Sequence, residues 1–287
     1  MQLNLFTDSR DVVLRNDAVI AARRQDVAAL QSAITALSAA LPGDRLLPDL
    51  AVLLAALTHP VAGALDAGQG RQALLELETL AQAARRVLGK EQQPWMAARW
   101  MTLARAVAHL PFQAHTAALH PAALLLRGEH WVEAQRAIET IPSWRRQPLP
   151  LAWHVHCTYR LEGLDAALPL LAELAWMDPD LTAEVIAILQ DPVLTQSVRD
   201  FEQALDGDAE PTDLGWWPAY LLIELPQCAA TVRSAQPGAG TAAERALRTV
   251  LELQVLERQG RQKEQLEARR ILRELHAGLF GHYLRKR

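Results

Sequence analysis

Apolar residues recur at helical spacing along almost the whole chain, in segments separated by glycine, proline or a capping residue. The first two predicted helices run over 10–24 and 26–41, where Asp26 can cap the second and Pro42–Gly43 ends it. Further helices are predicted over 44–57, 71–88, 94–110, 181–190, 192–205 and 215–225, with an irregular stretch over 58–70. No segment shows a convincing alternation of apolar and polar residues, as a half-buried strand would. The pattern therefore predicts an all-α protein.

Two neighbouring stretches, 120–142 and 150–179, repeat one pattern. Each contains an apolar helical run, a glycine, a second run with small residues, and a proline. Gly128 and Gly163 are 35 residues apart, close to the period of about 34 residues of a helix–turn–helix repeat. Glycine suits a tight turn between helices because it adopts positive φ without strain. A last pair, 242–259 and 261–276, turns at Gly260 in the same way.

The copy at residues 150–179 resembles tetratricopeptide-repeat proteins. The residues that carry the resemblance are Tyr159, Gly163, Ala167, Leu171, Ala175 and Pro179. It implies a superhelical stack of antiparallel helix pairs, a tetratricopeptide-like α-solenoid, which exposes a concave surface for a partner.

Turn-rich segments suggest how the chain is organised. Residues 1–9 are an N-terminal extended peptide, and 10–205 form the tetratricopeptide-like helical region. Residues 206–241 are rich in linkers and carry one apolar helix, with 234–241 the clearest flexible connector. Residues 242–287 hold the last helix pair and a basic tail, and can continue the same solenoid.

Composition narrows the cellular setting. Of 287 residues, 50% are hydrophobic, which is ample for a continuous core. The formal net charge of −4 excludes few classes of function. The two cysteines, Cys157 and Cys228, do not make a disulfide framework. No secretory signal or membrane-length apolar run is visible. We therefore expect a cytoplasmic protein with no membrane partner.

The sharpest local motif is at the N-terminus, where residues 2–6 read QLNLF. It resembles the peptide, of the form Q-L-x-L-F, by which many bacterial proteins bind the DNA sliding clamp. In such a peptide Leu5 and Phe6 would enter an apolar pocket, Leu3 would add a smaller contact, and the Gln2 amide would bond at the rim. Alternatively, the three apolar residues cover the exposed end of the first helix pair.

The C-terminal segment is basic. Residues 258–287 contain nine Lys or Arg against three Glu. On the last predicted helix an apolar stripe is formed by Ala268, Ile271, Leu272 and Leu275. The candidate cations lying opposite or beside it are Lys263, Arg269, Arg270 and Arg273. Such a face can bind nucleic acid or an acidic protein, or it can simply be solvated. No aromatic residues are interleaved for base stacking, which weakens the nucleic-acid interpretation.

Eight tryptophans offer further candidates for recognition. Trp144, Trp216 and Trp217 lie at predicted turns between helices, where they can serve as exposed anchors for a partner. Trp131, Trp153 and Trp176 lie where repeat cores need bulk, so packing is the expected role of most of the others.

No catalytic, metal or cofactor motif stands out. His154, His156 and Cys157 lie close in sequence, but there is no HExxH, no paired CxxC and no phosphate-binding glycine loop. The sequence therefore predicts a non-enzymatic interaction scaffold, a subunit of a larger bacterial complex, with no metal or cofactor. The alternatives are a replication or repair accessory protein tethered to the sliding clamp, and a binder of nucleic acid or acidic protein.

Overall fold

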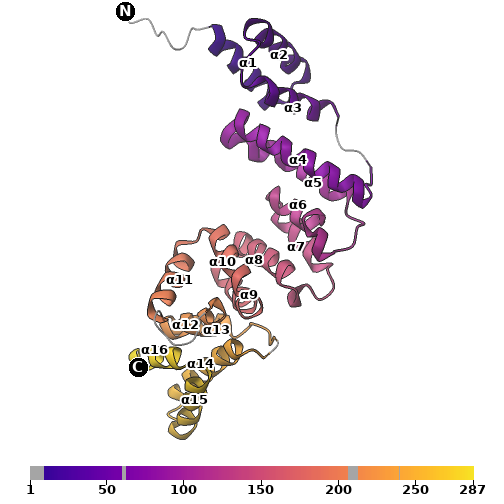
Figure 1. Cartoon of the computed structure of the whole chain (residues 1–287). Coiled ribbons are helices and arrows are strands. Elements are labelled where there is room, and N and C mark those ends of the chain that lie inside the picture. The colour runs from indigo at the N-terminus through magenta and orange to yellow at the C-terminus, as the bar shows by residue number, and fades with distance from the viewer. Residues whose placement is uncertain (1–9, 60–62, 206–212, 239) are drawn as a thin grey trace, which may run out of the picture. The chain divides into compact units, whose positions relative to one another are not determined.

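The computed structural model describes residues 10–59, 63–205, 213–238 and 240–287. Within these ranges it contains sixteen α-helices, joined by turns and short 3₁₀ segments, and no β-strand (Figure 1). The predicted all-α class is therefore confirmed for the described part of the chain. Of the helices in these ranges, none combines the length and apolarity that a membrane crossing requires.

The chain forms two compact units, which meet in sequence between Ala134 and Gln135. This boundary falls inside helix α7 (Trp131–Glu139) and therefore inside the first of the two repeated stretches. The boundaries after residues 9, 205 and 241 that the sequence suggests stay predictions.

In the first unit, each helix from α1 to α5 packs against the next one along the chain. The helices are α1 (Arg10–Arg24), α2 (Val27–Ala40), α3 (Leu47–Thr58), α4 (Ala67–Leu88), α5 (Gln92–Ala106) and α6 (Pro121–Arg127). The carboxylate of Asp26 accepts a hydrogen bond from the Ala29 amide at 2.9 Å, so it caps α2 as expected.

Helix α4 begins earlier than the sequence indicated, because the glycine-rich stretch before Arg71 is helical. Asp66 starts the helix with a capping box: its carboxylate accepts from the Gly68 and Gln69 amides, and the Gln69 side chain accepts from the Asp66 amide. A Cβ on Gly70 would lie 3.1 Å from side-chain methyls of Leu119 and Val107. Glycine here therefore permits close packing rather than a turn.

The second unit contains the remaining helices. They are α8 (Pro148–Glu162), α9 (Leu164–Met177), α10 (Pro179–Leu189), α11 (Pro192–Leu205), α12 (Trp217–Glu224), α13 (Ala229–Val232), α14 (Ala242–Arg258), α15 (Gln262–Leu275) and α16 (Ala277–Arg285). Helix α9 packs against α8, α10, α12 and α13. Its residues 167–176 are all buried, which is typical of a helix enclosed on every side.

The two repeated glycines end their helices for different reasons. Gly163, between α8 and α9, has φ 89° and ψ −175°, a conformation essentially reserved for glycine. Gly128 has φ −86°, and the left-handed residue of that turn is Glu129, with φ 58°. A Cβ on Gly128 would lie 2.7 Å from the His130 ring, so close packing selects glycine there.

Buried carboxylates hold the connector at 234–241. The Gln236 amide donates to Glu173, and the Gly238 and Gly240 amides donate to Glu244. Glu173 is fully buried and also receives two hydrogen bonds from the Arg145 guanidinium, at 2.6 and 2.7 Å. These bonds hold Gln236, Gly238 and Gly240, three residues of the segment that the sequence predicts to be a flexible connector.

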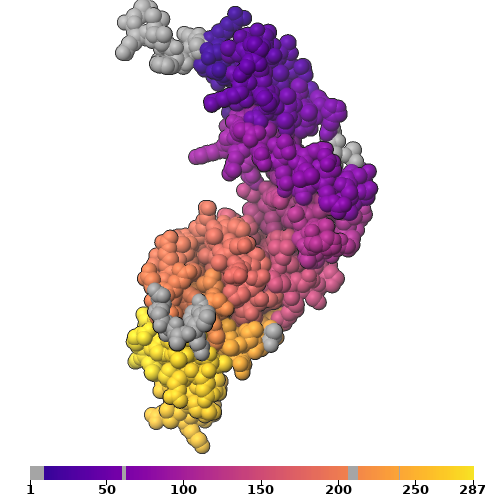
Figure 2. All heavy atoms as spheres, in the orientation of Figure 1, coloured from indigo at the N-terminus to yellow at the C-terminus, as the bar shows by residue number. Residues whose placement is uncertain are grey.

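The tail after residue 276 is also ordered, although the sequence predicted no helix there. His276 caps α16 by accepting from the Leu279 amide, and Leu279 and Tyr283 are buried. The space-filling view shows the C-terminal helices, in yellow, against the orange segment that contains α11 and α12 (Figure 2). Tertiary packing therefore stabilises a helix that is too short to form alone.

Candidate functional site

The residues of the clamp-like motif, Gln2, Leu3, Leu5 and Phe6, lie outside the described residues. Helix α1 begins at Arg10, so the motif precedes the first helix.

Neighbouring groups engage two of the four candidate polyanion-binding residues. Arg269 donates to the Tyr283 hydroxyl at 3.3 Å and lies 3.5 Å from the Glu257 carboxylate. Arg270 pairs with Glu267 and Glu274 on its own helix.

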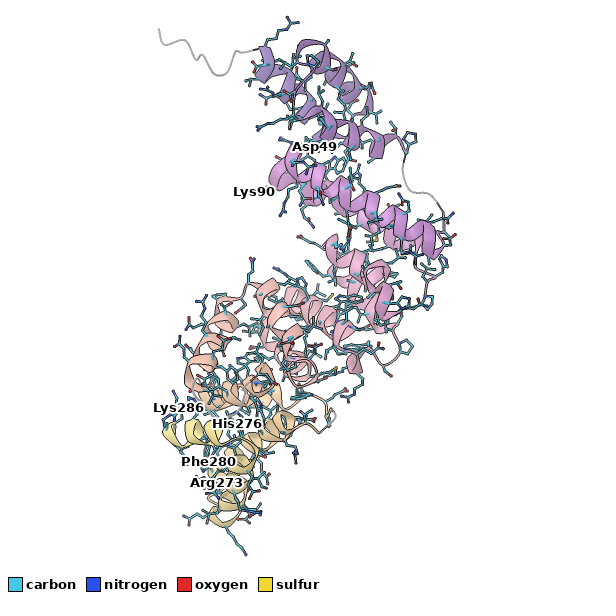
Figure 3. All side chains as sticks on the ribbon, in the orientation of Figure 1. Asp49, Lys90, Arg273, His276, Phe280 and Lys286 are labelled. Carbon is cyan, nitrogen blue, oxygen red and sulfur yellow. The ribbon has the colours of Figure 1, made fainter. Side chains whose placement is uncertain are left out.

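Lys263 and Arg273 are exposed, and neither forms an ion pair within the described ranges. Figure 3 labels Arg273 on α15. The predicted apolar stripe holds at Ala268 and Leu272, which are buried, whereas Ile271 is exposed. The four cations do not form one free basic face.

Two of the three tryptophans proposed as anchors make ring contacts, and the third is buried. Trp217 is 1% exposed and donates its indole N–H to Ser197 Oγ at 2.9 Å, so it belongs to the core and the prediction that it is exposed is wrong. Trp144 is half-buried and stacks on His154, with ring centroids 4.1 Å apart. Trp216, also half-buried, meets the His276 ring edge-on at 4.6 Å. Both partly exposed tryptophans thus pack within the second unit.

The histidine and cysteine cluster is structural in character. His154 contacts Thr158 and Glu139, and burial lowers its pKa. Burial raises the pKa of the Cys157 thiol to about 12, which disfavours the nucleophilic thiolate. In the described part of the chain, no three or more His, Cys, Asp or Glu side chains are grouped to hold a metal ion.

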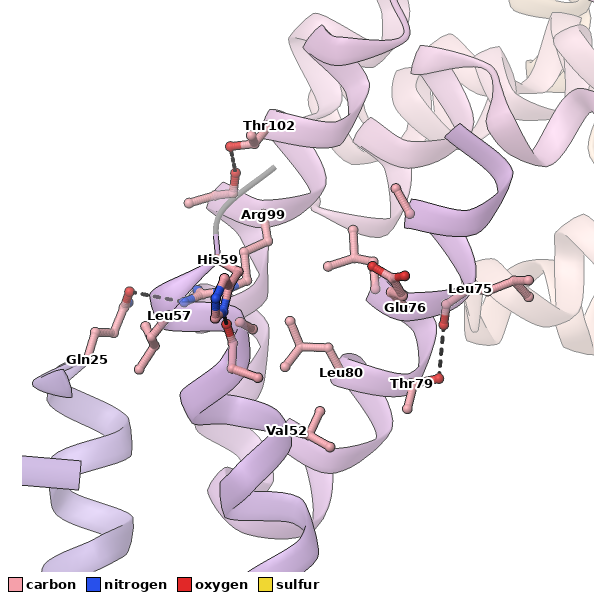
Figure 4. Close-up of a pocket in the computed structure, with 15 residues that line it drawn as sticks. Gln25, Val52, Leu57, His59, Leu75, Glu76, Thr79, Leu80, Arg99 and Thr102 are labelled. Carbon is pink, nitrogen blue, oxygen red and sulfur yellow. Dashed lines mark hydrogen bonds between the residues drawn. The ribbon is translucent and has the colours of Figure 1, made fainter. Parts of the chain in front are cut away.

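The first unit contains a groove that the sequence analysis did not single out. It has a volume of about 660 Å³ and is lined by α3, α4 and α5 together with Gln25 from the turn between α1 and α2 (Figure 4). On α3 the lining residues include Val52, Ala56 and His59, and on α4 they include Ala73, Leu77 and Leu80. We call this cavity the α3–α5 groove.

Helical spacing explains why these residues meet in one groove. Positions 52, 56 and 59 on one helix, and 73, 77 and 80 on the other, are three or four residues apart, so each set lies along one helix face. Alanines on all three walls are too short to fill the space between the helices. Leu75 stands at the groove with 58% of its surface exposed.

Arg99 supplies the charge inside the groove. Its guanidinium lies 3.4 Å from the centroid of the Trp95 ring, donates to the Trp95 carbonyl oxygen at 2.5 Å, and reaches Gln25 Oε1 at 3.4 Å. Burial lowers the pKa of Arg99 to about 10, so the side chain stays charged at neutral pH. Among the described residues, no carboxylate pairs with it.

Glu76 gives the groove a polarity. It lies on the α4 wall, across from Arg99 in the close-up, and accepts a hydrogen bond from Gln72 at 2.8 Å (Figure 4). The groove therefore has a cationic wall and an anionic wall with apolar surface between them. This arrangement can orient a ligand that carries a charge.

No protein-family model, curated protein or solved structure matches this chain. The two signals that could have indicated the groove are the Trp95–Arg99 pair at i, i+4 and the alanines that share faces with leucines.

Proposed function

We propose that the protein is a non-enzymatic interaction scaffold that binds another protein through the α3–α5 groove. The groove itself carries this proposal, because its volume of about 660 Å³ and its apolar lining with a few polar groups are typical of a binding pocket. The polar side chains that line it are Arg99, Glu76, His59 and neutral groups, and His59 Nδ1 lies 2.9 Å from the Thr58 hydroxyl at the end of its own helix.

The proposed architecture is a tetratricopeptide-like α-solenoid, and the scaffold works in the cytoplasm as a subunit of a larger bacterial complex. The order of packing in the first unit supports this, because each helix contacts its sequence neighbour, as stacked helix pairs do. The glycine turn between α8 and α9 supports it as well.

Capture of partners from the native host tests the scaffold function. Leu75→Ser removes an exposed apolar side chain at the groove, and Leu266→Ser removes an equally exposed one from α15, where 66% of the leucine is accessible. Proteins retained by the wild type and by Leu266→Ser should be lost from Leu75→Ser. An unchanged set of proteins on Leu75→Ser would count against binding through the groove.

A second proposal concerns the N-terminal motif, which matches the clamp-binding pattern at Gln2, Leu3, Leu5 and Phe6 and precedes α1. In this function the protein is a replication or repair accessory factor tethered to the sliding clamp. A synthetic peptide of residues 1–9 should then bind the clamp with a dissociation constant near 1 μM, that is about 8 kcal/mol. The same peptide with Leu5→Ala and Phe6→Ala should not bind, and equal binding by both peptides would exclude the motif.

Binding of nucleic acid or acidic protein through the last helix pair gains no support from the ion pairs of Arg269 and Arg270. It would have to rest on Lys263 and Arg273, because Lys286 and Arg287 at the C-terminus pair with Glu224 and Glu257.

A further inference from the structure

The feature of the α3–α5 groove that points to its ligand is the positive charge of Arg99, for which the described residues supply no carboxylate partner. Arg99 is half-buried among apolar side chains, and its partners there are a carbonyl oxygen, an amide oxygen and an aromatic ring. All three are neutral. Removing a guanidinium from water is costly unless a carboxylate compensates it, and arginine offers a carboxylate two parallel hydrogen bonds. A ligand with a carboxylate would complete this site.

The dimensions of the groove distinguish between possible peptide conformations. The lining of α3 extends from Val52 to His59 and that of α4 from Ala73 to Leu80, so each wall is about 10 Å, or two helical turns, long. An extended peptide of that length has about three residues and would direct only one or two side chains inward. A helix of two turns presents three or four apolar side chains on one face. The helix therefore fills the groove better.

Charge fixes the orientation of such a helix. Glu76 lies on the wall opposite Arg99, so a ligand carboxylate is repelled at that wall and attracted at the other. Glu76 receives a hydrogen bond from the neutral Gln72 side chain, and none of the described residues forms an ion pair with it. A helix with its carboxylate toward Glu76 would bind poorly.

Resting on the proposed scaffold function, we propose that the α3–α5 groove binds an amphipathic helix of a partner protein. Two turns of the helix lay their apolar face between α3 and α4, and an Asp or Glu beside that face pairs with Arg99. Leu75 contacts the helix at the rim. Specificity comes from the carboxylate, whereas the apolar face supplies most of the affinity.

A displayed peptide library provides the test. Its members are 14-residue peptides with leucine fixed at i, i+3, i+4 and i+7 and all other positions random, selected on the full-length protein. We expect enriched peptides to share one Asp or Glu at a constant offset from the leucines and to become helical on binding. Arg99→Gln should weaken their binding about 10- to 100-fold, since a charge-assisted hydrogen bond is lost.

Matched variants make the result decisive. Arg105→Gln removes the same charge from an exposed position of α5 outside the groove and should change affinity less than about twofold. In the selected peptide, replacing the shared acid by Gln or Asn should weaken binding to the wild-type protein. The same replacement should cause no further loss of affinity for the Arg99→Gln variant. This peptide-side change keeps the test valid even if Arg99→Gln is destabilised.

The contrary outcomes separate the two proposals. Enriched peptides that lack an acid, or that bind Arg99→Gln as tightly as the wild type, would overturn the pairing with Arg99. The scaffold function would still stand if Leu75→Ser abolishes the binding of those peptides. Failure to enrich any peptide sensitive to Leu75→Ser would overturn the helix, whereas loss of the scaffold function would show as an unchanged set of captured proteins on Leu75→Ser. Thermal stabilisation by dodecanoate without peptide binding would assign the groove to small apolar acids and overturn the helix.

Discussion

Two arginines show how burial and pairing combine at single residues. Arg145 makes two hydrogen bonds to Glu173, which is fully buried, so its charge is matched and fixes a connector of the second unit. Arg99 is also partly buried, but its partners in the described structure are neutral. Paired buried charges are part of a fold, whereas an unmatched one in an open groove is available to a ligand.

Leu171 provides the simplest test of residue packing. It is fully buried in α9, and Leu171→Ala should lower the free energy of unfolding by about 2–5 kcal/mol because a cavity remains. Urea denaturation measures this loss. Leu266→Ala, at an exposed leucine of α15, should change the value by less than about 0.5 kcal/mol. Similar losses in both variants would mean that burial in α9 is wrongly assigned.

His120 should make the protein sensitive to acid. Its Nδ1 accepts from the Ala122 amide and caps α6, and burial lowers its pKa from 6.5 to about 4. The folded state therefore favours the neutral ring. This contribution is complete above pH 6.5 and is lost as the pH falls from 6.5 toward 4, because the unfolded chain binds the proton more readily.

Replacing His120 by Asn retains a capping acceptor that does not titrate. The free energy of unfolding of His120→Asn should therefore fall less than that of the wild type between pH 7 and pH 5, as measured by denaturant titration at each pH. Parallel pH profiles for the two proteins would show that His120 is not the acid-sensitive group.

At the scale of elements, local signals placed most helix ends. The predicted bounds 10–24 and 192–205 agree with α1 and α11. The start of α4 was set too late, because glycines suggested a loop and the capping box at Asp66 was not recognised. Helix α16 was missed because its stability depends on burying Leu279 and Tyr283 against other helices, which no local pattern reveals.

The turn between α8 and α9 gives a prediction at this scale. Gly163→Ala should destabilise the protein by about 1–3 kcal/mol, because a side chain is strained at φ 89°, ψ −175°. Gly43→Ala is a suitable control, since φ there is not positive and a Cβ would meet nothing within 4 Å. Thermal unfolding should give a lower midpoint for Gly163→Ala than for Gly43→Ala, and equal midpoints would argue against a glycine-specific turn.

At the scale of the whole molecule, the sequence could predict a fold class but not the groove. The groove combines residues between 25 and 102 from three helices and a turn, and each of them is unremarkable in its own segment. Only tertiary placement brings an arginine, several alanines and an exposed leucine together. The motif at residues 2–6 is the opposite case, because it is visible in the sequence while its residues lie outside the described structure.

The central claim is that the α3–α5 groove holds a partner protein in the cell. Site-specific photocrosslinking tests it most directly, with a photoreactive amino acid in place of Leu75 and, in a matched strain, in place of Leu266. The account predicts a discrete crosslinked protein from position 75 that is absent from position 266 and is lost when Arg99→Gln is added. No crosslink at position 75, or the same products from both positions, would contradict it.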